Sequence, residues 1–281
     1  MTTVRVTHIG GPTTLIEVDG WRLLTDPTFD APGRRYSFGW GTSSRKVAGP
    51  AMAVGDLPPV DAVLLTHDHH GDNLDDAGRE LLASAGTVLT TGAGARRLGG
   101  DAQGLAPWEI FRLEAPAAPA APDAPESPGR PGRPGHPAIE ITATPCRHGP
   151  PLSRPVVGDV IGFALRWDGQ EHGTFWISGD TVLYEGVRQV ADRLDIGTAL
   201  LHLGAVRFSL TGPIRYTMTA QDAVELLGLI RAHTVLPVHY EGWTHFRQGR
   251  DAIEPIFAGA PEPVRDSIRW LPLGVATDVE V

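Results

Sequence analysis

Three histidines and two aspartates lie within six residues of the chain, at positions 67–72 (HDHHGD). Burying so many imidazole and carboxyl groups without partners would cost a large amount of free energy. Imidazole nitrogens and carboxylate oxygens are also the ligands that zinc, manganese and iron take in proteins. The cluster therefore predicts a metal site rather than a solvated loop.

Further histidines and aspartates occur where other apolar runs end. The run at residues 60–66 precedes the cluster, and His148, Asp180 and His239 follow three later runs. A single histidine at a strand end is often only a hydrogen-bonded structural residue. Four such sites in this order are difficult to explain by chance, so we expect them to converge on one or two divalent metal ions, most simply zinc, with manganese or iron as alternatives.

The positions of strands and helices predict the frame that holds these residues. Strands come first with few helices between them and later alternate with helices, which two packed sheets with helices outside would satisfy. The predicted strands are residues 4–7, 13–18, 22–25, 60–66, 87–91, 139–144, 160–167, 174–178, 199–203 and 234–238, and the helices are 74–84, 184–194 and 220–232. Asp19-Gly20 predicts a hairpin turn, and Thr219 with Asp222 has the spacing of a capping box.

Composition limits the class of protein. Of 281 residues, 41% are hydrophobic, which is enough for a sizeable core. The net charge of −9 and the lack of a Lys/Arg cluster disfavour a nucleic-acid partner. The one cysteine, Cys146, excludes an internal disulfide and a four-cysteine zinc site. No run of about 18 apolar residues and no secretory signal is present, so we expect a cytoplasmic protein that acts on a small molecule.

Proline occurs at every third position of residues 115–137, where alanine and glycine fill most of the gaps. Such a segment has almost nothing to bury, and we expect a surface insertion that is disordered or partly extended. The remainder predicts a single domain over residues 1–281, and the oligomeric state is left open.

With these motifs in place, the sequence resembles the metallo-β-lactamase superfamily. Its motif His-x-His-x-Asp-His is similar to residues 67–72, and His148, Asp180 and His239 match its later histidine, bridging aspartate and final histidine. The resemblance implies an α+β fold, the four-layer αββα sandwich, with a metal site along one edge of its sheets. His8, Asp26 and residues 237–243 (PVHYEGW) are similar to the branch of ascorbate-phosphate lactonase and the N-acyl phosphatidylethanolamine phospholipase D enzymes.

The first motif departs from the family spacing by one residue. If the loop is longer after His69, then His67 and His69 bind one metal and Asp72 approaches the second. Asn73 then stands where the family has a histidine, and His70 could replace the missing imidazole.

In the other register, Asp68 and His70 are the ligands and His69 is spare. We favour the first register because His67 directly follows the apolar run, where the family places its first ligand.

The resemblance implies a metal-dependent hydrolase whose metals lower the pKa of a bound water from about 15.7 towards 7. Asp180 would bridge the metals and Asp72 would accept or orient the proton of the water, so both are predicted catalytic residues. Esters, lactones and phosphodiesters suit this chemistry, and the branch favours a lactone or a phosphodiester. The alternatives are a non-catalytic binding protein that has lost a metal and a di-iron redox protein.

Other residues near these motifs have two interpretations each. Tyr240, Trp243 and His245 follow the last ligand and either bind substrate or pack beneath the site. Asp26 either orients a ligand histidine or caps a turn with the following proline. Cys146 is interpreted as a small buried side chain.

Overall fold

Two large β-sheets dominate the computed structural model, which describes residues 3–114 and 136–281. The predicted proline-rich insertion, apart from its last two residues, lies outside the described residues. The first sheet has the strand order β15-β1-β2-β3-β6-β7-β8, and the second has the order β14-β13-β12-β11-β10-β9. A separate two-stranded sheet pairs β4 with β5.

The strands of the first sheet are β1 (Thr3–Gly10), β2 (Thr13–Val18), β3 (Trp21–Thr25), β6 (Ala62–Leu64), β7 (Thr87–Thr91), β8 (Gln103–Leu105) and β15 (Thr277–Glu280). Those of the second are β9 (Ile110–Leu113), β10 (Ile139–Pro145), β11 (Ile161–Arg166), β12 (Thr174–Ile177), β13 (Ile196–His202) and β14 (Thr234–Val238). The small sheet contains β4 (Arg35–Ser37) and β5 (Ser43–Arg45).

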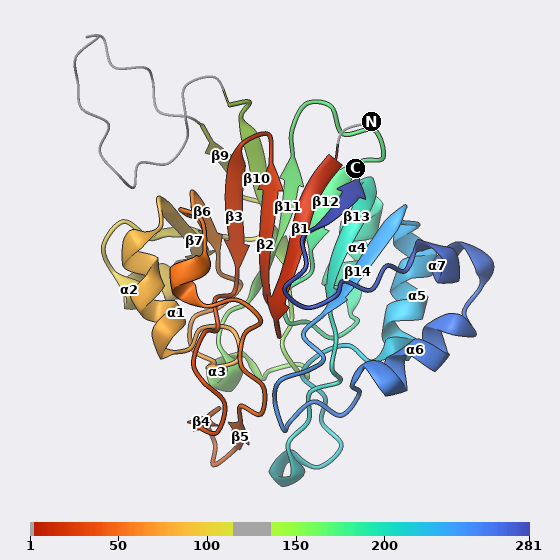
Figure 1. The fold of residues 1–281 in the computed structure, drawn as a ribbon. Coiled ribbons are helices and arrows are strands. Elements are labelled where there is room, and N and C mark those ends of the chain that lie inside the picture. Colours follow the sequence, from red (N-terminus) through yellow and green to blue (C-terminus); the bar gives the residue numbers. More distant parts are fainter. Residues whose placement is uncertain (1–2, 115–135) are drawn as a thin grey trace.

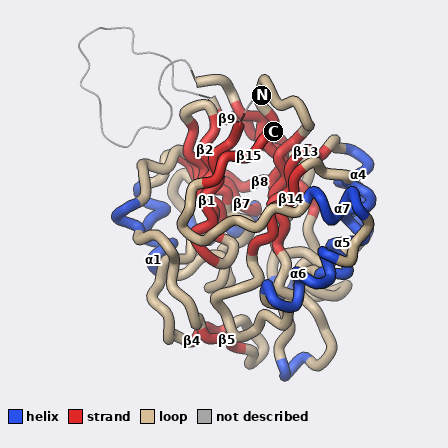
Figure 2. The backbone as a smooth tube through the Cα atoms, turned by 45° about the vertical axis from the view of Figure 1, so that its right-hand side comes forward, coloured by secondary structure: helices blue, strands red, loops and turns tan. Residues whose placement is uncertain are grey.

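Helices cover the outer faces of both large sheets (Figure 1). The helices are α1 (Asp76–Leu81), α2 (Gly92–Leu98), α3 (Arg154–Val157), α4 (Glu185–Arg193), α5 (Ala220–Ile230), α6 (Arg250–Ala258) and α7 (Glu262–Ser267). Helices α1 and α2 lie beside the first sheet, and α4 to α7 lie beside the second, with the strands between them (Figure 2). The predicted αββα sandwich is therefore confirmed.

Alternation along the strands separates the inner core from the outer layers. On β12, Phe175 and Ile177 pack into the core between the two sheets, whereas Trp176 packs against the helices of the second sheet. Successive side chains of a strand point to opposite faces of the sheet. Both sets of positions are apolar here because both faces are covered.

Local signals in the sequence explain two of the connections. Asp19 and Gly20 both have left-handed φ values, 47° and 85°, as a tight turn between the antiparallel strands β2 and β3 requires. Thr219 and Asp222 form the predicted capping box at the start of α5, in which each side chain accepts a hydrogen bond from the other's backbone N–H.

The predicted elements omit several short or polar ones. Strand β15 contains one buried residue, Val279, and exists because it pairs with β1 at the edge of the first sheet. Helices α6 and α7 likewise contribute only a few buried residues each. Their positions depend on packing, which periodicity alone does not reveal.

Strand direction brings the carboxyl ends of β3, β6, β10, β12, β13 and β14, among other strands, to one end of the sandwich. Strands β3 and β6 are parallel, as are β12, β13 and β14. Strand β10 runs in the same direction as β12 because both are antiparallel to β11. Every polar residue that follows one of these strands therefore points towards the same end of its sheet.

No helix among the described residues is long and apolar enough to cross a lipid bilayer.

The contribution of the capping box to stability can be tested by mutation. Replacing Thr219 by alanine removes the acceptor for the Asp222 N–H and should lower the free energy of unfolding by about 1 kcal/mol. Thr219→Ser keeps the hydroxyl and should change it much less. Urea unfolding of both variants measures the difference, and equal stability of the two would contradict a capping role.

Candidate metal centre

A first group of donors consists of three buried histidines: His67 and His70 after β6, and His148 after β10. Their ligand nitrogens lie within 4.8 Å of one another. His67 Nε2 is 3.1 Å from His70 Nδ1, and the His148 ring lies 5.0 Å from the His70 ring, centroid to centroid. Three imidazoles from two different sheets thus face one point.

Asp26 and Thr66 orient His67. The Thr66 hydroxyl donates to the Asp26 carboxylate at 3.0 Å and lies 3.1 Å from His67 Nδ1. Because that hydroxyl proton is directed to Asp26, the Thr66 oxygen accepts from His67 Nδ1–H, which leaves the Nε2 lone pair free for a metal. Hydrogen bonds thus connect Asp26 to His67 through Thr66, as an orienting role would require.

A backbone carbonyl orients His148 in the same manner. His148 Nδ1 donates to the carbonyl oxygen of Tyr216 at 2.8 Å, so its Nε2 faces the other two histidines without a proton. This arrangement fixes the tautomer that a metal requires.

Burial keeps the first group neutral. It lowers the pKa of His67 and of His70 well below the ordinary value, and the neighbouring imidazoles lower both further. Burial also lowers the pKa of His148 to about 3. All three therefore present uncharged nitrogens at neutral pH, which is the form that binds cations.

A second group of donors contains Asp72, Asp180 and His239, all buried and with ligand atoms within 4.8 Å of one another. His239 Nε2 lies 3.5 Å from Asp72 Oδ2, and its Nδ1 lies 3.3 Å from Asp180 Oδ1. The backbone of His239 is left-handed, with φ of 58°, and its N–H donates to the Gly11 carbonyl. Such a conformation costs free energy in a non-glycine residue and is concentrated at functional sites.

The two carboxyl groups of the second group respond differently to their surroundings. Burial alone would raise the pKa of Asp72, but contacts with His239 and His245 outweigh burial and bring the pKa well below its ordinary value. For Asp180, burial raises the pKa well above the ordinary value, and the nearby charges of Asp72 and Asp26 raise it further. A cation between the two aspartates would hold both in the ionised form.

Buried polar atoms without hydrogen bonds indicate that the donors fit a cation. Among the described residues, both carboxylate oxygens of Asp180, both ring nitrogens of His239 and Oδ1 of Asp72 lack a hydrogen-bond partner. Such atoms are rare in proteins because leaving them unsatisfied is costly. Coordination by divalent metal ions would satisfy the carboxylate oxygens and the unprotonated ring nitrogen of His239, so the donor set fits a metal centre.

The predicted ligands His69 and Asp68 lie beside the first group but outside both groups. His69 turns towards helix α3, where its Nε2 contacts the Val157 carbonyl. The Asp68 carboxylate accepts from Arg97 Nε at 2.9 Å, and its backbone carbonyl accepts from Arg79 at 3.0 Å. Of the first register, the donor groups contain His67, Asp72 and also His70, which that register allowed to replace the missing imidazole; of the second register, they contain His70 alone.

Asn73, which stands where the family motif has a histidine, belongs to the Asp26 network. Its Nδ2 donates to Asp26 Oδ2 at 3.3 Å, and it is fully buried. The imidazole of His245 instead approaches the second group, with its Nε2 2.9 Å from Asp72 Oδ2.

The other two residues proposed to bind substrate have different surroundings. Tyr240 is buried in the outer core, where its ring packs against Trp270 at 5.4 Å. Trp243 packs against Tyr36 and Phe38 in an aromatic cluster near β4. Of the three, His245 lies nearest to the donor groups.

His202 and Cys146 lie near the two donor groups. His202, at the end of β13, was not among the predicted site residues because it lies within an apolar run. It is fully buried, and its Nε2 lies 3.4 Å from Asp26 Oδ2. The rule that identified His239, a histidine at the end of a buried strand, would also have found it. Burial raises the pKa of the Cys146 thiol well above its ordinary value, and Sγ donates to the Ser178 carbonyl at 2.9 Å.

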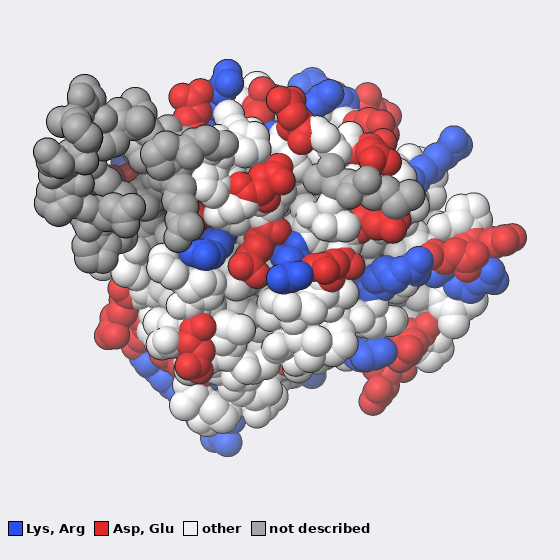
Figure 3. All heavy atoms as spheres, turned by 45° about the horizontal axis from the view of Figure 1, so that its top comes forward, with Lys and Arg blue, Asp and Glu red and all other residues white. Residues whose placement is uncertain are grey.

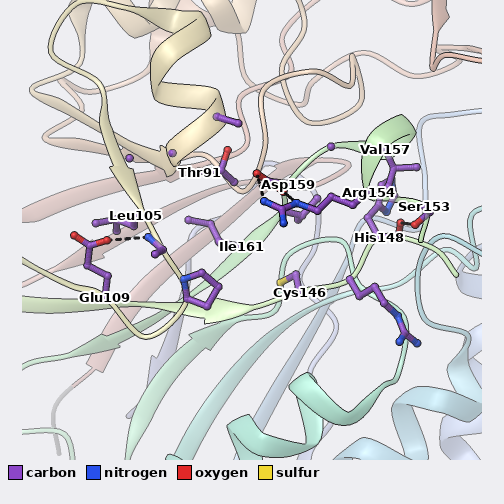
Figure 4. A pocket seen from close by; sticks show the side chains of 18 of the residues that line it. Thr91, Leu105, Glu109, Cys146, His148, Ser153, Arg154, Val157, Asp159 and Ile161 are labelled. Atoms are coloured by element: carbon purple, nitrogen blue, oxygen red, sulfur yellow. Dashed lines mark hydrogen bonds and ion pairs between the residues drawn. The ribbon is translucent and has the colours of Figure 1, made fainter. Parts of the chain in front are cut away.

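Two cavities meet at His148. A narrow cavity of about 20 Å³ is lined by His70 and His148 and by aromatic side chains, which include Phe38, Phe208 and Tyr216. A larger pocket of about 670 Å³ lies between α2, α3 and the end of β10 and also includes His148 in its wall. Figure 4 shows this larger pocket, with Arg154 directed to its ion-pair partner Asp159.

On the face drawn in Figure 3, acidic and basic side chains are interspersed, so this face has no continuous basic surface.

Comparisons with known proteins agree with this architecture. Residues 21–240 match the family model described as the beta-lactamase superfamily domain. A metal-dependent hydrolase of Pyrobaculum arsenaticum is 25% identical over 234 residues, which cover 83% of each chain. The solved isothiocyanate hydrolase from Delia radicum gut bacteria superimposes with a TM-score of 0.76 at 19% identity, over 97% of this chain and 98% of that one.

The fold is shared more widely than the activity. CmlA, a di-iron β-hydroxylase from Streptomyces venezuelae, superimposes with a TM-score of 0.65 at 15% identity, and the match covers 54% of that chain. This similarity concerns the fold alone.

The chain belongs to the beta-lactamase superfamily domain family, since the family model covers most of its length. The predicted superfamily and the predicted class, a metal-dependent hydrolase, are thereby confirmed.

The roles of His69 and His70 in the first motif can be distinguished by mutation. His70→Ala removes one of the three histidine nitrogens that face one another. It should weaken metal binding by more than about 100-fold, because loss of a group that only orients a ligand typically weakens metal binding about 10–100-fold. His69→Ala removes a contact with the Val157 carbonyl and should retain the metal. Metal content after dialysis at fixed free zinc measures both, and the reverse order would mean that His69 is the ligand.

Asp26 should act on metal affinity through Thr66 and His67. Asp26→Asn removes the charge that receives the Thr66 hydroxyl proton and should weaken metal binding about 10–100-fold. Asp75→Asn is the matched control, because Asp75 is a buried carboxylate that pairs with Lys46 outside both groups. The control should lower the free energy of unfolding but leave metal affinity unchanged. Equal metal affinity of wild type and Asp26→Asn would exclude the orienting role.

Proposed function

We propose that the protein binds two divalent cations, zinc in the first instance, and hydrolyses a small ester or lactone. The observation that carries this proposal is the pair of buried donor groups, one of three histidines and one of two aspartates and a histidine, beside an aromatic cavity. When bound, the cations would lower the pKa of a coordinated water and offset the negative charge that develops on the substrate oxygen.

The two aspartates would have separate tasks. Both oxygens of Asp180 are free of hydrogen bonds within the described structure, so this carboxylate is suited to contact two cations. Asp72 has one free oxygen, Oδ1, while its Oδ2 lies against His245 and His239. We assign to Asp72 the orientation of the attacking water: despite burial, contacts with His239 and His245 keep the pKa of this carboxyl group low, so it is ionised and able to accept a hydrogen bond from that water.

The cavity favours a neutral substrate. Of the described residues that line the aromatic cavity, none is lysine or arginine. A phosphodiester is anionic, and proteins usually bind such groups with charged donors, of which arginine is the most frequent. Phe38 and Phe208 instead present apolar surface beside His70, which suits the carbonyl of an ester or lactone with an apolar substituent. The larger pocket, on the other side of His148, offers room for the rest of the substrate. Its wall contains Arg96, Arg147 and Arg154, which suit a polar group distant from the reacting carbonyl.

Metal-dependent turnover is the direct test. The zinc-loaded protein should hydrolyse members of a panel of lactones and carboxylic esters, whereas bis-p-nitrophenyl phosphate, an activated phosphodiester, should react no faster than it does with free zinc alone. Chelation should abolish turnover and lower the melting temperature, because free metal at 100 times its Kd adds about 2.7 kcal/mol to stability. Added zinc should restore both.

A variant of a predicted ligand distinguishes loss of the metal from loss of the fold. His67→Ala removes a ligand of the first group and should abolish turnover while the circular dichroism spectrum remains that of the wild type. Turnover that persists after verified metal removal would refute the hydrolytic mechanism, and preferential cleavage of the phosphodiester would refute the neutral substrate class.

A further inference from the structure

A third group of donors lies at the opposite end of the sandwich. His172 precedes β12, His233 precedes β14, and Glu280 is on β15. Their ligand atoms all lie within 4.8 Å of one another. Because His172 and His233 stand at the amino ends of strands whose carboxyl ends lead to Asp180 and His239, this group is separated from the metal centre by the length of those strands.

The two histidines are neighbours whose rings stack with centroids 3.8 Å apart and an interplanar angle of 18°. Because the lone pairs of stacked rings point in parallel directions, both nitrogens reach one ion after a side-chain rotation, which the exposed position of His233 permits. Two imidazole nitrogens and a carboxylate oxygen form a donor set that zinc, nickel and copper bind, and that hard cations such as magnesium and calcium bind poorly.

Backbone hydrogen bonds hold the three donors in place. Glu171 N–H donates to the Val281 carbonyl at 3.0 Å, which ties the turn that carries His172 to the last residue of the chain. Thr174 N–H donates to the Asp195 carbonyl at 2.7 Å on the other side of that turn. Glu280 pairs with Thr3 across the β15–β1 ladder. These bonds fix the backbone that carries the donors, so only the side chains need to rotate when the donors bind a cation.

Burial of its neighbours directs Glu280 outward. Val279 and Val281 are buried in the core between the sheets, whereas Glu280 is exposed. Successive residues of a strand point to opposite faces, so packing of the two valines fixes the direction of the carboxylate.

We propose that His172, His233 and Glu280 bind one divalent transition-metal ion, with zinc as the physiological choice. The ion joins β15, the edge strand of the first sheet, to the segments that lead into β12 and β14 of the second sheet. It stabilises the closure of the sandwich at its C-terminal strand, and it takes no part in hydrolysis at the distant metal centre.

Zinc binding and thermal unfolding test the site on the intact, metal-loaded protein. In equilibrium dialysis against rising free zinc, the wild type should bind one equivalent more than His233→Ala. The melting temperature should rise with zinc beyond saturation of the metal centre in the wild type and not in His233→Ala. Glu280→Gln should weaken this additional equivalent about 10-fold or more.

Two controls assign the additional equivalent. Glu262→Gln removes an exposed carboxylate from α7 and should bind zinc as the wild type does. His67→Ala should lose zinc from the metal centre but keep the additional equivalent. Equal zinc content and equal melting shifts in wild type and His233→Ala would overturn the proposal, as would loss of the additional equivalent in His67→Ala.

Discussion

The carboxylate of Asp26 is the interaction on which the metal centre depends. It accepts hydrogen bonds from the backbone N–H of Thr66 at 2.7 Å, from the Thr66 hydroxyl and from Asn73, and His202 Nε2 lies 3.4 Å away. These partners come from the loop that follows β6 and from β13. One buried charge therefore links the first sheet to the second beside the two donor groups, and only a fully partnered charge is tolerable there.

This dependence connects binding to folding. The first sheet supplies His67, His70 and Asp72, and the second supplies His148, Asp180 and His239. Neither sheet alone offers a complete set of donors, and the ligand atoms meet only when the inner core between the sheets is packed. Free energy of metal binding is then also free energy of folding, because the unfolded chain holds these donors far apart.

Much of this arrangement could be predicted from the sequence, and the rest depends on contacts that the sequence does not display. Apolar runs predicted the central strands, and the polar residues that follow them predicted His67, His148, Asp180 and His239 as neighbours. The choice between His69 and His70 depends on the carbonyl of Val157, which is 88 residues distant from His69. The Asp68 carboxylate likewise accepts a hydrogen bond from Arg97, which lies on helix α2. Spacing within the motif contains no information on either contact.

The additional residue of the motif requires a position without a side chain. A Cβ atom on Gly71 would lie 2.4 Å from Cδ1 of Tyr36, and the backbone of Gly71 is not left-handed, so space rather than conformation demands glycine. Tyr36 is held in place by the Trp243 ring at 4.9 Å and by the hydrogen bond of its hydroxyl to Asp30. At Gly71 the chain passes this ring, between His70 in one donor group and Asp72 in the other.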